Sequence, residues 1–317
     1  METPQNEPQW ERQLLEKIAF STLQEQKAKR RWGIFFKLAG LAYLVAVLVL
    51  VVDWGSSEKL VDGKHTAVIY LHGTIESGGD ASAEKLNGAL QSAFEDKGTA
   101  GVILRINSPG GSPVQSGIVY DEIRRLRAKY PEIPLYVVVE DLCASGGYYI
   151  AAAADRIFVD KASIVGSIGV LMDGFGFTGT MDKLGVERRL LTAGENKGFL
   201  DPFSPQDTKQ QDHARLLLGE IHKQFIDVVR QGRGKRLKET PEMFSGLMWT
   251  GSQSIQLGLA DDFGTVDSVA RDVIKADKIL DYSVKENIAE RFAKRLGADM
   301  AQSLVFRLIG GERVVIR

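Results

Sequence analysis

The chain has 317 residues, of which 44% are hydrophobic and 26% are charged, so it can form one large folded domain or two ordinary ones. Its formal net charge of -1 gives no reason to expect nucleic-acid binding. A single cysteine, Cys143, excludes an intrachain disulfide, and the four histidines lack a metal-ligand spacing such as HExxH. We therefore expect no metal, no other cofactor and no nucleic-acid partner.

Residues 1–32 are predicted to form a tail on the cytoplasmic side of a membrane. Within residues 8–31, Trp10, Leu14 and Ile18 recur at helical spacing. This pattern is typical of a helix that lies on a membrane surface or pairs with a partner. A solvated, partly helical tail gives the same pattern, so both interpretations stay open.

Residues 33–54 are predicted to form a transmembrane anchor. The stretch 38–52 carries no charge, and a helix of about twenty apolar residues crosses the core of a bilayer. Trp32 and Trp54 flank the segment, as aromatic residues often do at the membrane interface. A cleaved signal peptide is disfavoured by the long polar stretch ahead of the segment and by the lack of a small-x-small cleavage site. A buried core helix is the other alternative.

The basic residues around this segment predict its orientation. Lys59 and Lys64 lie close on its C-terminal side, and more basic residues lie on or ahead of it: Lys27, Lys29, Arg30, Arg31 and Lys37. The positive-inside rule then places the N-terminus in the cytoplasm. The rest of the chain is expected outside the inner (plasma) membrane, in the periplasm of a Gram-negative bacterium.

Residues 55–280 are predicted to form one α/β domain, because apolar runs alternate with helical patterns along them. The apolar runs are continuous, which indicates strands buried in a largely parallel sheet. The predicted strands are 67–71, 101–106, 135–139, 156–159 and 186–191. The predicted helices are 83–94, 114–129, 146–154 and 207–231.

Residues 281–317 are predicted to form a helical C-terminal extension. Within 285–309, apolar residues step by four along the chain: Ile288, Phe292, Leu296, Met300, Leu304 and Leu308. An apolar stripe of this kind packs against another surface. The same domain, a neighbouring subunit and the membrane are all candidates for that surface.

A diglycine turn follows the predicted strand 101–106. It consists of Pro109, Gly110 and Gly111, and the predicted helix 114–129 comes directly after it. Two glycines allow the backbone to turn sharply and to expose N–H groups. Such groups can bind an anion or the oxyanion of a reaction intermediate, although most turns of this type have only a structural role.

Ser145 stands where a predicted strand ends and a predicted helix begins. A serine there can be a nucleophile. The Gly146 N–H and an N–H of Gly110 or Gly111 would then converge on the negative charge that develops in the reaction. Ser145 can equally be an ordinary helix N-cap.

No histidine lies between Ser145 and Lys197, so this lysine has to be considered as the base. To accept a proton near pH 7, a lysine needs a pKa well below its usual value of about 10.4, which burial against apolar groups can produce. Taken alone, Lys197 has the pattern of a solvated surface charge. Nearby phenylalanines could supply the burial that Lys197 needs: Phe175, Phe177, Phe199 and Phe203.

Ser167 lies in a loop between strands, and its hydroxyl could orient the base.

In this order, the motifs resemble the S49 peptidases, the signal peptide peptidase A family. The matching segments are NSPGG at 107–111, ASGGYY at 144–149, GSIGV at 166–170 and GENK at 194–197. The resemblance covers about residues 66–280, and the short single-copy length with an N-terminal anchor is similar to the short bacterial form. It implies a ClpP/crotonase-like fold behind a single N-terminal transmembrane helix.

The resemblance also implies the roles of individual residues. Ser145 matches the nucleophile, Lys197 the general base, and Ser167 the serine that hydrogen-bonds the lysine. The oxyanion hole is then expected from Gly110, Gly111 and Gly146. The implied activity is that of a membrane-anchored serine endopeptidase that degrades cleaved signal peptides. Family members form dome- or bowl-shaped homo-oligomers whose sites are completed across subunits, so we expect an oligomer here.

Three other interpretations remain. A Ser-His-Asp triad could use His213 or His222, although both lie on a polar helical stretch well past Ser145 and are expected to face solvent. A crotonase-type acyl-CoA enzyme would share the fold and the oxyanion turn. An inactive relative that acts as a membrane-anchored scaffold would need neither Ser145 nor Lys197.

Overall fold

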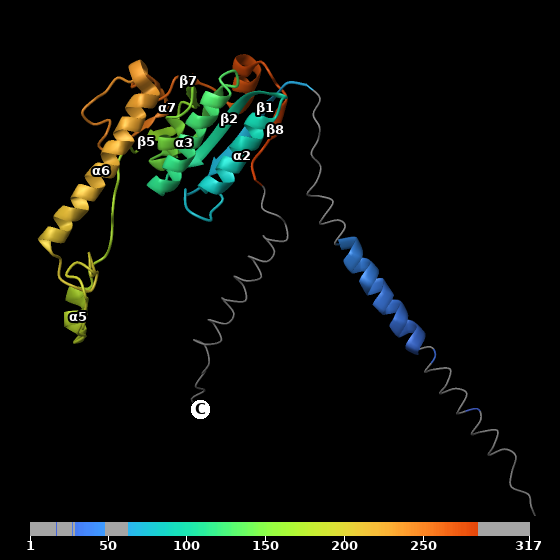
Figure 1. The fold of residues 1–317 in the computed structure, drawn as a ribbon, viewed down its shortest axis with the longest axis horizontal. Coiled ribbons are helices and arrows are strands. Elements are labelled where there is room, and N and C mark those ends of the chain that lie inside the picture. The colour runs from blue at the N-terminus through green and yellow to red at the C-terminus, as the bar shows by residue number, and fades with distance from the viewer. Residues whose placement is uncertain (1–16, 18–26, 28, 48–62, 285–317) are drawn as a thin grey trace, which may run out of the picture. The chain divides into compact units, whose positions relative to one another are not determined.

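The computed structural model describes residues 63–284 together with residues 17, 27 and 29–47 (Figure 1). Residues 63–284 belong to one compact unit, and the N-terminal residues belong to another. The predicted C-terminal helix at 285–309, residues 48–54 of the predicted anchor and most of the 8–31 pattern lie outside the described residues. The structure therefore leaves these predictions as they stand.

Residues 29–47 form a helix, drawn in blue in Figure 1. Its apolar side chains are exposed, and the ring of Trp32 contacts those of Phe35 and Phe36 with centroids 5.7 and 5.8 Å away. Within the described part of the chain, no helix combines the length and the hydropathy required to cross a bilayer. The anchor at 33–54 accordingly remains a sequence-based prediction.

The core of the unit that contains residues 63–284 is an eight-stranded sheet with the order β6-β5-β3-β2-β1-β8, in which β4 also pairs with β3 and with β7. All pairings are parallel except that of β5 with β6. Its strands are β1 (His65–His72), β2 (Thr99–Ser108), β3 (Leu135–Ala144), β4 (Arg156–Val159), β5 (Ile164–Gly166), β6 (Met248–Thr250), β7 (Asp262–Phe263) and β8 (Ile279–Asp281). A parallel sheet is buried on both faces, which explains the continuous apolar runs in the sequence.

Helices cover the two faces of the sheet unequally. The larger core lies between the sheet and a set of helices that includes α2 (Ala83–Glu95) and α3 (Pro113–Lys129), which lie side by side over it in Figure 1. The smaller core on the second face centres on Val68, Ile103 and Val138. It is closed by the segment after β7, which contains α8 (Val266–Ser268) and η2 (Val269–Ile274). Helix α7 (Gly251–Gln256) precedes β7, and its Ile255 packs against the larger core.

The predicted α/β class with a largely parallel sheet is confirmed, but one predicted strand is wrong. Residues 186–191 form no strand, and Leu191 is 96% exposed. The preceding helix α5 (Thr178–Leu184) ends at Gly185, which has a left-handed conformation. Apolar residues alone do not make a strand where no neighbouring strand is present to pair with them.

The predicted boundaries around Ser145 also need correction. Strand β3 continues to Ala144, five residues beyond the predicted end. Glu140 and Asp141 interrupt the apolar pattern at a shift in the register with β2, and pairing resumes beyond them with β2 at Cys143 and with β5 from Leu142 to Ala144. Helix α4 (Gly146–Ala151) ends three residues early, since the N–H groups of Ala153 and Ala154 bond three residues back in a tight turn. Ser145 is thus the single residue between strand and helix.

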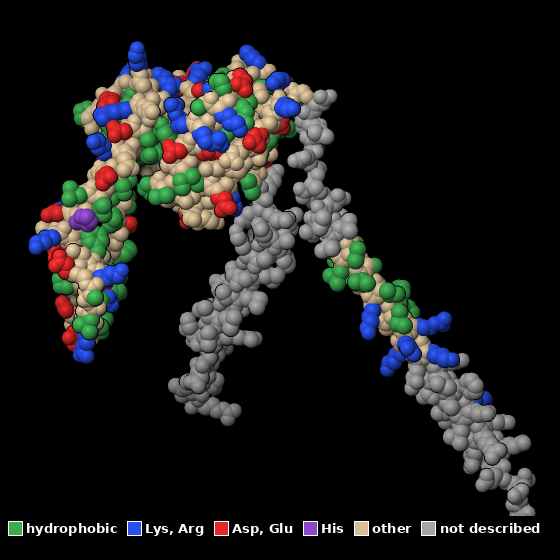
Figure 2. All heavy atoms as spheres, viewed as in Figure 1, with side chains coloured by type: hydrophobic (Ala, Val, Ile, Leu, Met, Phe, Trp, Pro, Cys, Tyr) green, Lys and Arg blue, Asp and Glu red, His purple; other side chains and the backbone are tan. Residues whose placement is uncertain are grey.

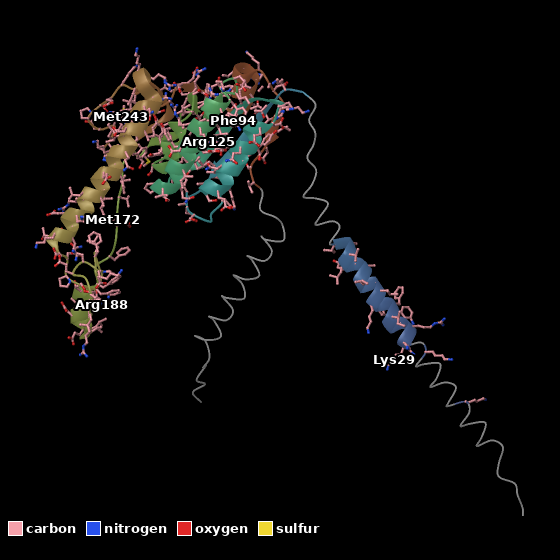
Figure 3. All side chains as sticks on the ribbon, in the orientation of Figure 1. Lys29, Phe94, Arg125, Met172, Arg188 and Met243 are labelled. Atoms are coloured by element: carbon pink, nitrogen blue, oxygen red, sulfur yellow. The ribbon has the colours of Figure 1, made fainter. Side chains whose placement is uncertain are left out.

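We call the sheet and the helices packed on it the body of this unit. A long helix, α6 (Thr208–Arg233), extends from the body. None of residues 169–213 is buried, and α5 lies at the far end of α6 from the sheet (Figure 1). We call residues 170–213 the arm. Figure 3 shows Met172 and Arg188 on the arm, well away from Phe94 in the body. Hydrophobic side chains are exposed among charged ones along it (Figure 2).

A buried ion pair attaches the base of α6 to the body. Arg233 is 1% exposed, and its guanidinium donates to Asp261 Oδ2 at 2.9 Å and to the Gly258 carbonyl at 2.8 Å. The same carboxylate accepts from the Ile157 N–H at 2.7 Å. Burial raises the pKa of Asp261, but the hydrogen bonds and positive charges of Arg233 and its neighbour Arg236 outweigh burial and hold the pKa below its usual range.

We expect Asp261→Asn to lower the free energy of unfolding at pH 7 by about 3 kcal/mol, because it leaves the buried Arg233 charge without its partner. The pKa of Asp261 is lowered in the folded state, so its contribution is complete above the unfolded pKa of about 3.9 and is lost as the pH falls through the folded pKa. Urea unfolding at pH 7 and pH 3 should therefore show a difference between variant and wild type that shrinks at the lower pH.

Asp262→Asn is the matched control, because the Asp262 carboxylate is exposed and lies 3.5 Å from Arg156. It should change stability by less than about 0.5 kcal/mol. Equal effects of the two substitutions at pH 7 would contradict the importance of the buried pair.

Candidate active site

Ser145 has a backbone conformation that is unusual for a residue with a side chain. Its φ is 50° and its ψ is -122°. Its N–H donates to the Gly166 carbonyl and its carbonyl accepts from Tyr149, both at 2.9 Å. The side chain makes no capping hydrogen bond to α4, so Ser145 does not act as the N-cap that the sequence also allowed. The strained conformation leaves the hydroxyl half-buried and available.

The surroundings of Ser145 explain how this strain is maintained. Ala144 is in register with Gly166 of β5, so β3 is held up to the residue before the serine. On the other side, Tyr148 of α4 is fully buried and its hydroxyl donates to the Leu259 carbonyl at 2.8 Å. A disfavoured φ persists only where neighbouring structure fixes it on both sides, as it does here.

The diglycine turn lies directly against Ser145. A Cβ added to Gly110 would stand 2.6 Å from both the Gly146 nitrogen and the Ser145 Cβ. Gly110 has a φ of 97° and Gly111 a φ of 149°, so both use conformations that favour glycine. The structure therefore brings the predicted oxyanion turn and the predicted nucleophile into contact.

The two glycines of the turn differ in what their N–H groups do. The Gly110 N–H donates to Ser108 Oγ at 3.1 Å. Gly111 forms a parallel bridge with Ile75 through the Gly110 carbonyl and the Ser112 N–H, so its own N–H points away from Ile75. Gly111, and not Gly110, lines the cavity that contains Ser145.

Gly146 supplies a second N–H at the same place. As the first residue of α4, it has no partner within the helix for its N–H. A Cβ at Gly146 would stand 3.3 Å from the Gly111 nitrogen, so the two N–H groups are close neighbours. Together they can stabilise negative charge on an oxygen bonded to the atom that Ser145 attacks.

Ser167 is a second strained serine in the same cavity. Its φ is 51°, and its N–H donates to the Leu247 carbonyl at 2.7 Å. Ser145 and Ser167 both line a cavity of about 550 Å³. Its apolar part is formed by Tyr149, Val170, Leu171, Ile221 and Phe225. The structure thus brings together the predicted nucleophile, the predicted orienting serine and the oxyanion turn.

Lys197 is not part of this arrangement within one copy of the chain. It lies in a turn of the arm, where its N–H donates to the Gly194 carbonyl at 3.1 Å, and it is exposed. It does not line the Ser145 cavity. Among the phenylalanines expected to bury it, Phe177 stacks on Phe203 with ring centroids 5.4 Å apart, and Phe199 packs against His213. The pairing of Ser145 with Lys197 remains a prediction.

The two histidines of α6 differ from each other. His213 is exposed and packs edge-on against the ring of Phe199 at 5.8 Å. His222 is half-buried, and its Nε2 lies 3.2 Å from the Ile168 carbonyl. The expectation that both face solvent is therefore wrong for His222. Neither ring lines the Ser145 cavity, so the geometry offers no Ser-His pair.

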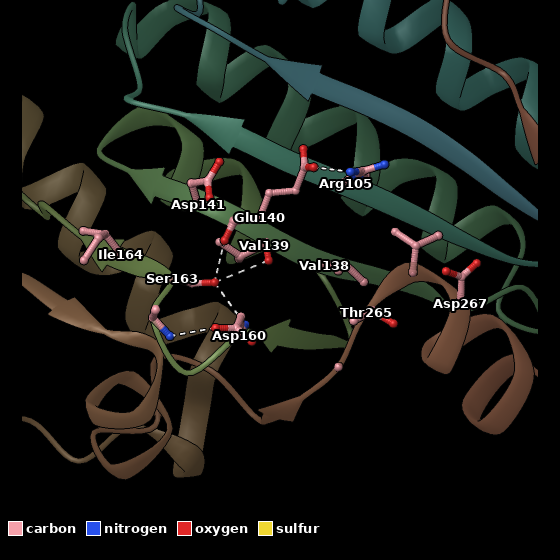
Figure 4. A pocket seen from close by; sticks show the side chains of 13 residues that line it. Arg105, Val138, Val139, Glu140, Asp141, Asp160, Ser163, Ile164, Thr265 and Asp267 are labelled. Atoms are coloured by element: carbon pink, nitrogen blue, oxygen red, sulfur yellow. Dashed lines mark hydrogen bonds and ion pairs between the residues drawn. The ribbon is translucent and has the colours of Figure 1, made fainter.

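A second cavity of about 530 Å³ lies beside β3 and the segment that follows β7 (Figure 4). Arg105 and Glu140 form an ion pair there, and His72 Nε2 lies 2.5 Å from Glu140 Oε2. The serine of this cavity, Ser163, donates its hydroxyl proton to the Glu140 carbonyl at 2.5 Å, so its hydroxyl is already hydrogen-bonded to the backbone. Among the residues that the structure describes, no cluster of three or more His, Cys, Asp or Glu could hold a metal ion.

These features define a class of site. A serine held at positive φ between a strand and a helix, beside converging backbone N–H groups, is how α/β hydrolases and related enzymes present a nucleophile. The arrangement therefore has the geometry of a serine-hydrolase site.

Sequence comparison identifies the family. The model of peptidase family S49 matches residues 127–280. A putative protease of Synechocystis is 32% identical over 202 residues, which are 64% of this chain and 70% of the relative. A putative signal peptide peptidase SppA of Enterococcus faecium is 28% identical over 323 residues, which are 90% of this chain and 93% of the relative. The chain belongs to peptidase family S49.

Another relative differs in overall organisation. A protein of Brucella melitensis called Na(+)/H(+) antiporter NhaA is 46% identical over 209 residues, which are 64% of this chain. This chain spans 28% of the length of that relative. The antiporter name thus describes a protein most of which lies outside the aligned part.

We expect Ser145→Gly and Ser145→Ala to remove the nucleophile equally but to differ in stability. Glycine adopts a φ of 50° without strain, whereas alanine does not, so Ser145→Gly should be more stable than Ser145→Ala by about 1 kcal/mol. Urea unfolding of the two variants measures this difference. A more stable alanine variant would show that the residue is not strained.

Gly110→Ala is expected to remove activity while Gly117→Ala keeps it. The new methyl group at position 110 would collide with Gly146 and Ser145 at 2.6 Å and displace the oxyanion turn, which should lower kcat by about a hundredfold or more. Gly117 lies within α3 and has nothing within 4 Å of an added Cβ. Initial rates of peptide hydrolysis for both variants test the difference, and equal rates would contradict it.

Proposed function

We propose that this protein is a membrane-anchored serine endopeptidase that uses Ser145 and Lys197 as a catalytic dyad and degrades cleaved signal peptides. The observation that carries the proposal is the strained Ser145 beside the N–H groups of Gly111 and Gly146. Membership of peptidase family S49 supports peptide hydrolysis as the reaction.

In the proposed mechanism, the neutral amine of Lys197 accepts the proton of Ser145 Oγ while Oγ bonds to the carbonyl carbon of the scissile peptide. The carbonyl oxygen becomes an oxyanion that accepts from the Gly111 and Gly146 N–H groups. The C–N bond then breaks, and the lysine returns the proton to the leaving amine. Water releases the second product from the acyl-enzyme by the same steps in reverse order.

Lys197 is proposed to act on the Ser145 of a neighbouring copy. In one copy the lysine is exposed on the arm and does not line the Ser145 cavity. The arm also exposes large apolar side chains, such as Phe175 at 80% and Leu171 at 78%, which a second copy would cover. Contact with that copy would also exclude water from the amine of Lys197.

The substrate and the location extend the proposal. Apolar residues line much of the Ser145 cavity, including Val170, Ile221 and Phe225, and they suit an apolar peptide segment such as the core of a signal peptide. The relative from Enterococcus faecium carries the name of a signal peptide peptidase. The uncharged stretch 38–52 would place the enzyme in the inner membrane, with its catalytic domain on the extracytoplasmic side.

Ser145→Ala and Lys197→Ala should each abolish hydrolysis of a synthetic signal peptide, because each removes one member of the dyad. Lys183→Ala, which removes an exposed lysine of α5, should leave the rate unchanged. When the two inactive variants are unfolded, mixed in equal amounts and refolded, about a quarter of the sites in a ring would combine an intact serine with a neighbour's intact lysine.

The outcomes separate the alternatives. Recovered activity in the mixture supports a dyad shared between copies, whereas a mixture as inactive as its components requires both residues to come from one chain. A fully active Lys197→Ala variant would exclude lysine as the base. Wild type that hydrolyses no peptide but reacts with acyl-CoA would exclude the proposed reaction altogether.

A further inference from the structure

We propose that His222 is a positioning residue that holds the Ser167 turn in its working conformation. The proposal rests on the proposed function, in which Ser167 orients the base. His222 lies on α6, and its Nε2 is 3.2 Å from the carbonyl of Ile168, the residue that follows Ser167. Because a carbonyl only accepts, Nε2 must carry the proton and donate.

The Ser167 turn needs external support. Gly166 and Ser167 have φ values of 119° and 51°, so two consecutive residues occupy a region that side chains disfavour. The Gly169 N–H then bonds back to the Ser167 carbonyl at 2.9 Å, which makes the chain reverse around Ile168. Such a segment keeps a single conformation only if the surrounding structure fixes it.

Three hydrogen bonds from outside the turn do this. The Ser145 N–H donates to the Gly166 carbonyl at 2.9 Å, and the Ser167 N–H donates to the Leu247 carbonyl at 2.7 Å. His222 donates to the Ile168 carbonyl. The first two bonds join backbone groups, so His222 is the one side chain among the three and the one that substitution can remove.

The position of His222 on α6 separates this role from simple helix packing. Phe225 and Val229 are buried at 4% and 0% exposure and already attach α6 to the body, together with Arg233. His222 lies on the arm side of these contacts, and its neighbour Ile221 lines the Ser145 cavity. The His222 bond thus links the helix that carries the arm to the turn that carries Ser167.

The histidine cannot serve as the base for Ser145 in this arrangement. Its Nε2 is occupied by the Ile168 carbonyl, and the ring does not line the cavity. Its effect on catalysis is therefore exerted through Ser167. The effect of substituting His222 should therefore depend on whether Ser167 is present.

The test is a double-mutant cycle on the full-length chain, with hydrolysis of a synthetic signal peptide as the readout. His222→Leu should lower kcat about tenfold with little change in KM, because it removes a partly buried hydrogen bond that fixes the turn. His222→Gln places an amide N–H near the position of Nε2 and should recover kcat to within about threefold of wild type. In the Ser167→Ala background, His222→Leu should change kcat by less than about threefold.

Lys223→Leu is the matched control, since this exposed residue is adjacent to His222 on the same helix. It should leave kcat unchanged. Effects of His222→Leu and Ser167→Ala that multiply independently, or a His222→Leu variant with wild-type kcat, would overturn the proposal. If His222→Leu does not fold, a His222→Gln variant whose kcat falls short of wild type by much more than about threefold would overturn it too. Inactive wild type would instead refute the proposed function.

Discussion

The site depends on one pairing, the short parallel contact between the end of β3 and β5, where Ala144 is in register with Gly166. It places two residues with disfavoured backbone conformations, Ser145 and Ser167, next to each other in one cavity. Without the pairing, Ser145 and Ser167 would relax to ordinary backbone conformations, and the arrangement of the two serines in the cavity would be lost. The diglycine turn adds to this arrangement because only residues without a Cβ can approach Ser145 and Ile75 so closely.

The sequence predicts the body of the fold well. Strands buried on both faces give continuous apolar runs, and helix signals such as Ser112 with Pro113 lie next to them. The short strands β5 to β8 have two or three residues each and carry no pattern of their own, so only tertiary contacts define them. The wrongly predicted strand at 186–191 shows the reverse case, an apolar pattern without a strand, because its apolar residues do not contribute to the core of this copy.

The sequence predicts only part of the candidate site, and the residues differ in what makes them predictable. Ser145, Ser167 and the glycines follow strand ends, and parallel strands bring their ends to one edge, so their proximity follows from the topology. Lys197 lies on a segment that the body does not bury, and no local pattern states which surface that segment contacts. His222 carries no motif. Its role depends on a bond to a backbone carbonyl 54 residues earlier in the chain.

The exposure of the arm has a consequence for how its sequence can vary. Substitutions of exposed residues usually change folding stability by less than about 0.5 kcal/mol, so Phe175 and Leu191 contribute almost nothing to the stability of an isolated copy. Retaining large apolar side chains on such a segment lowers solubility without stabilising the fold. Folding alone therefore places little constraint on the arm. Whatever selects its residues acts after the chain has folded, and the body and the arm are free to diverge at different rates.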